Sequence, residues 1–322
     1  RDFGQQVNQI SVVQNIPNPG VTKSANELQE KLVNQSALTQ LVIANELKWK
    51  VKYLYYEIQN KQELSTLYVS LSQTYLTNYN RAKARVKAGE TNQIELLSLQ
   101  SKWNEFNLLF RQNKIELSLL YQQFELLLNS STSVTRVDSI YKENYIPNMS
   151  LDSNIYLRIN EQNSAIEVAK INVIKSSIKP DFNVGYAAQN CYSGGWYSGA
   201  QVGVSFNIFR GQTKQKIAAQ QIQVKMINEL NESKQLDLKQ RIAKAEASIN
   251  LYNEGVKIYK EQIESTNPKM IQIAQLNYEA GEISYLELLN TLQLVANNSS
   301  NYWYQIMSYN KSVADYQLIN NQ

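Results

Sequence analysis

Two stretches of the sequence decide its fold: AGETNQIELL at residues 88–97 and AGEISYLELL at residues 280–289. Each ends one very long run of helical apolar periodicity and begins another. A glycine at a helix C-terminus supplies the left-handed conformation that most residues avoid. The Thr91 or Ser284 that follows, with a glutamate in the next turn, can then cap the second helix. Each stretch therefore predicts a tight hairpin between two antiparallel helices.

The two stretches are copies within an internal repeat, because they lie 192 positions apart. The same offset relates further identical residues: Val12 and Val204, Asn15 and Asn207, Ile16 and Ile208, and Asn129 and Asn321. A constant offset at distant landmarks means that the connecting helices have equal lengths in both copies. A structural repeat of this kind decides the architecture.

Composition narrows the classes of function. The chain has 322 residues and a net charge of +4, with Lys and Glu interspersed, so nucleic acid is not implied. It has no histidine and a single cysteine, Cys191, which excludes a disulfide framework, a Cys/His zinc site and histidine-based catalysis. We therefore expect no enzyme, no catalytic residue, no metal site and no cofactor. The N-terminus shows no signal peptide, so we expect a mature, processed or truncated chain.

The first repeat, residues 1–130, is expected to hold a strand at about 7–17 and a long helical hairpin at 24–129. Val13 and Gln14 break the apolar–polar alternation of the strand. The first helix of the hairpin contains no proline and is on the order of 100 Å long at 1.5 Å per residue. Its leucines follow the four–three spacing of a coiled-coil seam, with one phase slip.

The second repeat, residues 151–322, follows an irregular segment at 131–150. It is expected to contain a helix at 151–178, a β-hairpin at 181–209 and a second long helical hairpin at 212–320. The strands of the β-hairpin alternate cleanly between apolar and polar residues. The fold class is therefore mainly α with a small β part.

Strands of about ten residues with one apolar and one polar face are typical of a transmembrane β-barrel. Three strands cannot close a barrel, and lipid tolerates no open sheet edge, so closure requires several copies of the chain. The long helices need the same partners to bury their seams. The alternative is a soluble periplasmic or cytoplasmic coiled-coil scaffold or adaptor, which detergent dependence would distinguish from a barrel protein.

The sequence resembles the TolC-type outer-membrane efflux protein family. The resemblance covers nearly the whole chain and rests on KPDF at 179–182, VGVSFNIFRG at 202–211 and YEAGEISYLELL at 278–289. It implies a homotrimer with a 12-stranded barrel in outer-membrane lipid and an α-helical barrel across the periplasm. Such a protein is the passive exit duct of a tripartite pump or of a type I secretion system. Its partners are a periplasmic adaptor (membrane fusion) protein and an inner-membrane transporter, and an RND-type pump for heavy metals or drugs is favoured.

The chain departs from this family pattern at its start. By the 192-residue offset, the partners of helix 151–178 and of strand 181–189 fall before residue 1. Three strands per protomer give nine in a trimer instead of twelve. The hypothesis is that the chain is a fragment or the C-terminal part of a longer polypeptide, of which a fusion to the pump subunit is one form.

The resemblance also implies site residues at the periplasmic end of the duct. Glu287 and Asn290 correspond to the acidic rings that narrow the pore, and Gly89 and Gly281 mark the hairpin turns at which an adaptor docks. The alternative for Glu287 is a capping-box glutamate that bonds Ser284, and both roles can hold together.

A closed-state contact is implied between Tyr278 and Glu95. The arginine that the family places two residues after the second glycine is Ile283 here, so we expect that gating link to be missing.

Three further predictions concern Pro268, a set of aromatic residues and Cys191. Pro268 removes an N–H from the second long helix, so we expect a kink that either biases the tip toward opening or is merely tolerated. Tyr192, Trp196 and Tyr197 fit an aromatic girdle at the membrane interface, or else ordinary loop packing. Cys191 is expected to have no role.

Overall fold

The computed structural model describes residues 8–129, 137–147, 154–191, 194–206 and 210–320. Ten elements follow one another along the chain: β1 (Asn8–Ile16), α1 (Pro19–Lys87), α2 (Gln93–Leu128), α3 (Ile155–Ser176), β2 (Asp181–Cys191), β3 (Gly194–Ser205), α4 (Arg210–Glu261), the π-helical turn η1 (Gln262–Thr266), α5 (Asn267–Ala280) and α6 (Tyr285–Asn320). The predicted class, mainly α with a small β part, is confirmed. In the described part of the chain, no helix combines the length and the apolar character needed to cross a membrane.

Two compact units divide the chain, and each takes segments from both halves of the sequence. One unit consists of residues 1–42 and 151–237, and the other of residues 43–150 and 238–322. The units therefore group residues differently from the predicted repeats, which follow the chain from end to end. The repeat boundary at residues 131–150 stays a prediction.

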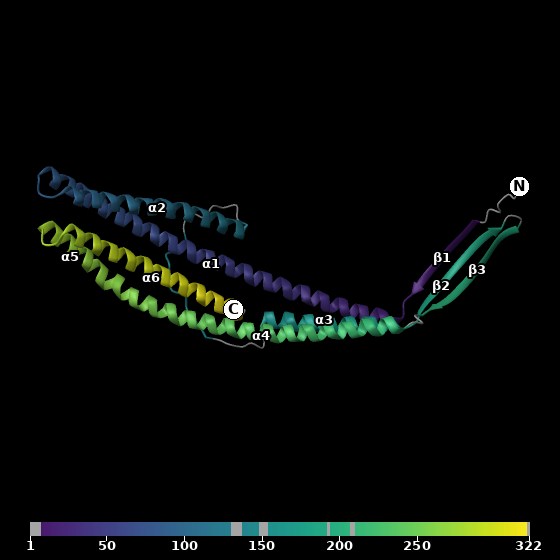
Figure 1. Cartoon of the computed structure of the whole chain (residues 1–322). Coiled ribbons are helices and arrows are strands. Elements are labelled where there is room, and N and C mark those ends of the chain that lie inside the picture. The colour runs from purple at the N-terminus through teal and green to yellow at the C-terminus, as the bar shows by residue number, and fades with distance from the viewer. Residues whose placement is uncertain (1–7, 130–136, 148–153, 192–193, 207–209, 321–322) are drawn as a thin grey trace. The chain divides into compact units, whose positions relative to one another are not determined.

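The first unit contains an antiparallel sheet with the strand order β1-β2-β3 (Figure 1). Pairing such as Val12 with Tyr186, and Tyr186 with Ala200, puts the even-numbered residues of all three strands on one face. That face is mainly apolar, and its large apolar side chains are exposed on this chain: Ile10, Val12, Ile16, Phe182, Val184, Tyr186, Trp196, Val202 and Val204. The odd-numbered face is mostly polar or small, so the two faces of the sheet differ in polarity.

β1 is continuous through Val13 and Gln14, although these residues interrupt its sequence alternation. Val13 lies on the polar face opposite Gly185, and Gln14 lies on the apolar face opposite Val184. The pairing with β2 holds the strand because main-chain hydrogen bonds do not depend on which side chain faces which way.

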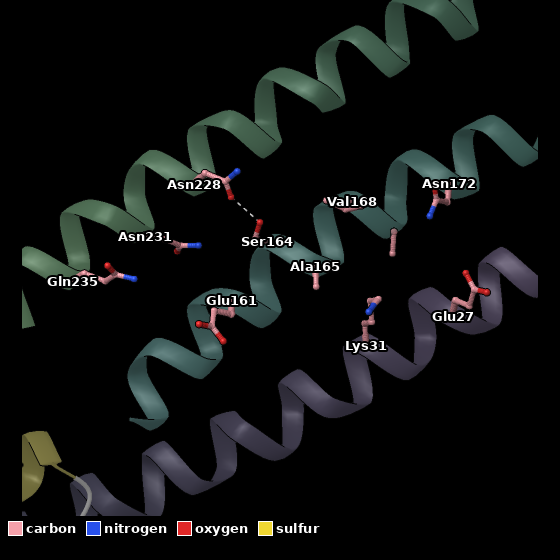
Figure 2. Close-up of a pocket in the computed structure, with 11 residues that line it drawn as sticks. Glu27, Lys31, Glu161, Ser164, Ala165, Val168, Asn172, Asn228, Asn231 and Gln235 are labelled. Atoms are coloured by element: carbon pink, nitrogen blue, oxygen red, sulfur yellow. Dashed lines mark hydrogen bonds between the residues drawn. The ribbon is translucent and has the colours of Figure 1, made fainter. Parts of the chain in front are cut away.

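Polar side chains connect the three helices of the first unit. Asn154 begins α3 by accepting hydrogen bonds from the N–H groups of Tyr156 and Leu157. Along α3, side-chain amides and a hydroxyl bond to α1 on one side and to α4 on the other: Gln35 to Asn163, Gln162 to the carbonyl of Lys31, Ser164 to Asn228, and Asn231 to the carbonyl of Asn160. Figure 2 shows α3 between α1 and α4, with the Ser164–Asn228 bond marked. This part of the unit is joined by directional bonds as well as by packing.

An apolar core joins the two helical hairpins in the second unit. Tyr75 of α1 stacks on Phe106 of α2, with 5.2 Å between the ring centroids. Leu99, Leu288 and Leu292 are fully buried beside them. Complete burial of a leucine contributes about 1.5–3 kcal/mol of transfer free energy. The long helices are therefore held by their seams and not by helix propensity.

Residues 137–147 cross this unit without forming a helix or a strand. The side-chain amide of Gln59 donates to the carbonyls of Asp138 and Ser139, at 3.1 and 3.2 Å. Asn310 of α6 bonds this segment from the other side, with the N–H of Glu143 and the carbonyl of Tyr141 as its partners. The segment thus connects α1 to α6.

Candidate functional site

Both helical hairpins turn by the same backbone arrangement. The first helix ends at a glycine with positive φ, Gly89 at 74° and Gly281 at 79°. In each copy the glycine N–H bonds to the carbonyl three residues back, and the next N–H bonds to the carbonyl five residues back; the pairs are Gly89 to Val86, Glu90 to Arg85, Gly281 to Tyr278 and Glu282 to Asn277. This is the Schellman motif, and it occupies equivalent positions of the 192-residue repeat.

The two return helices are capped by different residues. Ser284 and Glu287 form a reciprocal capping box, in which the Ser284 N–H donates to the Glu287 carboxylate at 2.8 Å and the Glu287 N–H donates to the Ser284 hydroxyl at 3.3 Å. In the first copy, the prediction that Thr91 caps the return helix is wrong. Asn92 is the N-cap, with its side chain accepting from the Glu95 N–H at 3.0 Å, while the Thr91 hydroxyl donates to the Glu95 carboxylate. The reason is phase, since Glu95 lies three residues after Asn92 and four after Thr91.

The structure brings Tyr278 and Glu95 together. The Tyr278 hydroxyl of α5 donates a hydrogen bond to the Glu95 carboxylate of α2, and both residues are only 4% exposed. Burial, reinforced by the carboxylate of Glu95, raises the pKa of the Tyr278 hydroxyl, so it remains a proton donor at neutral pH. This bond joins the first hairpin to the second at their tips.

Arg85 lies beside this pair. Its guanidinium is 3.5 Å from the Glu95 carboxylate and 5.6 Å from the centre of the Tyr278 ring. It therefore balances the charge of a carboxylate that is almost fully buried, which would otherwise carry a large desolvation cost. A second guanidinium, that of Arg81, forms an ion pair with Glu279 of α5 nearby along the helices.

Ile283, at the position where the family has an arginine, is partly buried against the apolar core. Ile283 cannot form a charged link, and Arg85 of α1 supplies a guanidinium to the Glu95 carboxylate. We call Tyr278, Glu95 and Arg85 the tip cluster.

Glu287 and Asn290 lie three residues apart on α6, and both are exposed. The Ser284 backbone N–H, followed by its hydroxyl, holds the pKa of the Glu287 carboxyl below its usual value. Glu287 is therefore charged at neutral pH. The capping bonds described above are present, and they leave the carboxylate accessible to solvent.

Pro268 lies in the first turn of α5, directly after the π-helical turn η1. The Asn267 N–H bonds to the carbonyl of Gln262, five residues back. Proline has no backbone N–H, so it cannot donate the hydrogen bond that would continue the α-helical pattern. A π turn directly before Pro268 is consistent with this interruption. The irregularity thus extends over the residues before Pro268.

The predicted interface aromatics have different positions. Trp196 lies on the apolar face of the sheet, where it pairs with Asn190, and its neighbour Tyr197 lies on the polar face opposite Gln189. Both are more than half exposed. Tyr192 lies outside the described residues. A girdle facing lipid would therefore include Trp196 but not Tyr197.

A groove of about 490 Å³ lies between α1, α3 and α4 in the first unit (Figure 2). Its lining consists of amides, small residues and three charged side chains, Glu27, Lys31 and Glu161. Among the described residues, no cluster of His, Cys, Asp or Glu could hold a metal ion.

Comparison with known proteins identifies the class. Residues 146–305 match the family of outer membrane efflux proteins. The chain is similar in structure to the CmeC outer membrane channel of Campylobacter jejuni (TM-score 0.81, 10% identity, covering 98% of this chain and 77% of that one). It is also similar to the MtrE outer membrane channel of Neisseria gonorrhoeae (TM-score 0.79, 12% identity, covering 98% of this chain and 80% of that one). A third similar structure is the outer membrane protein VceC of Vibrio cholerae (TM-score 0.76, 9% identity, covering 98% of this chain and 87% of that one). Among curated proteins, none matches the sequence significantly.

The resemblance to TolC-type outer-membrane efflux proteins is thus confirmed, in sequence for residues 146–305 and in fold for nearly the whole chain. The protein is an outer-membrane efflux duct that extends into the periplasm. Its family and its structural neighbours are channel proteins and not enzymes.

Sequence reasoning missed Arg85, Arg81 and Asn92. Arg85 had a usable signal, since it precedes Glu95 by ten residues across a predicted hairpin and is brought back toward it when the hairpin closes. Arg81 had none, because its partner Glu279 lies on the other hairpin.

Proposed function

We propose that the protein is the passive exit duct of a tripartite efflux pump, formed by three copies of the chain. A periplasmic adaptor and an inner-membrane transporter would be its partners, and an RND-type transporter for drugs or heavy metals is the favoured class. The observation that carries the proposal is the sheet with one mainly apolar, exposed face, connected in one chain to two long helical hairpins with equivalent turns.

The sheet supports insertion into lipid. Val12 is 70% exposed and Val202 is 78% exposed, on the same face. In water such a face would cost on the order of 25 cal/mol for each Å² of apolar surface, whereas in hydrocarbon it costs nothing. Because β1 and β3 are the edges of the described sheet, the barrel would be closed by other copies. A soluble coiled-coil scaffold has no use for this face, so the duct is the better account.

The hairpin tips support a gate at the periplasmic end. The Tyr278–Glu95 bond and the Arg81–Glu279 ion pair connect the first hairpin to the second within one protomer. We infer that these contacts hold the tip closed, with Arg85 stabilising Glu95 in place of the arginine that Ile283 replaces. An adaptor that docks on the turns at Gly89 and Gly281 would open the tip by breaking them.

Glu287 and Asn290 are proposed to line the constriction. Both are exposed on one face of α6, one turn from the hairpin. Three symmetry copies of one carboxylate near an axis attract cations and repel anions, as charged rings do in channels. Asn290 adds polarity without charge, so each protomer contributes a single charge to the ring.

The test is extraction of the full-length protein from outer membranes, followed by native mass spectrometry and bilayer recording. We expect a trimer that requires detergent, conducts ions and prefers cations. A chain that stays monomeric and soluble without detergent would overturn the duct and revive the scaffold. A conducting trimer that binds no periplasmic adaptor in vitro would overturn the tripartite assignment alone.

A further inference from the structure

The polar face of the sheet is organised in rows that run across the three strands. Strand pairing places one residue of each strand in a row. From the hairpin end toward the helices the rows are Gln9–Gln189–Tyr197, Ser11–Ala187–Gly199, Val13–Gly185–Gln201 and Asn15–Asn183–Gly203. Within the described strands the only charged residue is Asp181, at the start of β2. Glycine and amide residues therefore dominate this face.

Gly185 is buried although it lies in a sheet whose faces are otherwise largely open on this chain. Its neighbours in the row cover it from both sides. A Cβ added at Gly185 would lie 2.9 Å from Cγ and Nε2 of Gln201, and 3.1 Å from Cγ2 of Val13. The Gln201 side chain therefore lies flat across the strand, in the space that the missing side chain leaves.

The next row repeats this arrangement in the opposite direction. A Cβ added at Gly203 would meet the side-chain amide of Asn183, with Nδ2 at 3.0 Å and Cγ at 3.1 Å. Two adjacent rows thus each hold an amide flat over the glycine of a neighbouring strand. Gly199 lies in the row next to that of Gly185 on the hairpin side, and it has nothing within 4 Å of an added Cβ.

We propose that Gly185 and Gly203 set the bore of the β-barrel by letting Gln201 and Asn183 lie against the wall. This inference rests on the proposed function, in which the polar face lines the passage. A side chain at either glycine forces the amide away from the sheet and toward the axis, once in each protomer. Since these four rows carry no charge, they discriminate among solutes by size.

The test measures how far reagents of graded size enter the barrel from outside intact cells. Ser205→Cys, in a Cys191→Ser background, places a thiol on the polar face beyond the glycine rows. Labelling by maleimides of increasing size then reports the bore, and it does not depend on whether the periplasmic tip is open. Gly185→Ala is compared with Gly199→Ala, because both add one methyl group to the same face and only the first displaces an amide.

We expect Gly185→Ala to abolish labelling by the largest reagent that enters the unaltered barrel, and Gly199→Ala to leave labelling unchanged. Adding Gln201→Ala to Gly185→Ala should restore entry, which also shows that the variant barrel is folded. Equal labelling of Gly185→Ala and the parent overturns the inference, as does equal loss in Gly199→Ala. If even the smallest reagent fails to reach the thiol in the parent, the polar face lines no passage, and the proposed function fails with it.

Discussion

Glu95 and Glu287 lie at equivalent positions of the two hairpins, 192 residues apart, yet one is buried and the other is exposed. Each stands three residues after the residue that caps its helix, Asn92 or Ser284. Glu95 bonds to Tyr278 of the other hairpin, whereas Glu287 bonds to its own cap. The same position of the repeat thus provides a contact between hairpins in one copy and a solvent-facing charge in the other.

Tyr278→Phe is expected to loosen the tip. The change removes a buried hydrogen bond to a charged group, worth about 2 kcal/mol, or roughly a thirtyfold shift in the closed-to-open ratio. Single-channel conductance in planar bilayers should rise. Tyr259→Phe is the matched control. The hydroxyl of Tyr259 accepts a solvent-exposed hydrogen bond from the side-chain amide of Asn301, which lies in the same hairpin. Equal conductance of Tyr278→Phe and the parent would show that this bond does not close the duct.

Glu287→Gln is expected to remove the cation preference of the channel at neutral pH. In the parent the preference should persist below pH 4.5, the ordinary value for the carboxyl, because the cap lowers the pKa of Glu287. The same shift means that the cap contributes stability above that pH and loses it as the carboxylate becomes protonated. Reversal potentials measured across a pH series test how far below pH 4.5 the cation preference persists.

Glu254→Gln, at an exposed carboxylate of α4, controls for the loss of one charge per protomer. A midpoint above pH 4.5 in the parent would contradict the prediction, because it would mean that repulsion among three converging carboxylates outweighs the cap.

The turns were predictable from sequence because their chemistry is local. A left-handed residue after a long helix needs glycine, and Gly89 and Gly281 supply it in both copies. The cap of α2 was not predictable from such local chemistry, and the predicted Thr91 is the neighbour of the residue that caps the helix, Asn92. Both are good capping residues, and only the backbone phase of the turn decides which side chain reaches the Glu95 N–H.

The remaining features depend on pairing across the chain. Strand periodicity alone assigns Trp196 and Tyr197 to opposite faces, because neighbouring residues in a strand face opposite ways. The rows of the polar face, in contrast, can be predicted only when the register between β1, β2 and β3 is known. The π turn before Pro268 has no sequence signal apart from the proline itself.

Asn92→Ala is expected to destabilise the first hairpin by about 1 kcal/mol through loss of its N-cap. Thr91→Ala is the comparison. It should reduce the protection of the backbone amides from hydrogen exchange by a smaller amount, because the Thr91 hydroxyl bonds only to a side chain. Hydrogen exchange of the amides at the start of α2 measures both. A larger loss of protection in Thr91→Ala than in Asn92→Ala would contradict the assignment of the cap.

Pro268→Ala is expected to convert η1 to regular α-helix. The new N–H can bond the carbonyl of Glu264, which proline cannot, so the five-residue spacing between Asn267 and Gln262 loses its cause. Hydrogen exchange across residues 262–268 should slow, and conductance should fall if the kink biases the tip toward opening. Lys269→Ala, the exposed neighbour, should change neither. Slower exchange at unchanged conductance would show a tolerated kink, and unchanged exchange would show that other contacts, such as the bond from Asn298 to Asn267, hold the π turn.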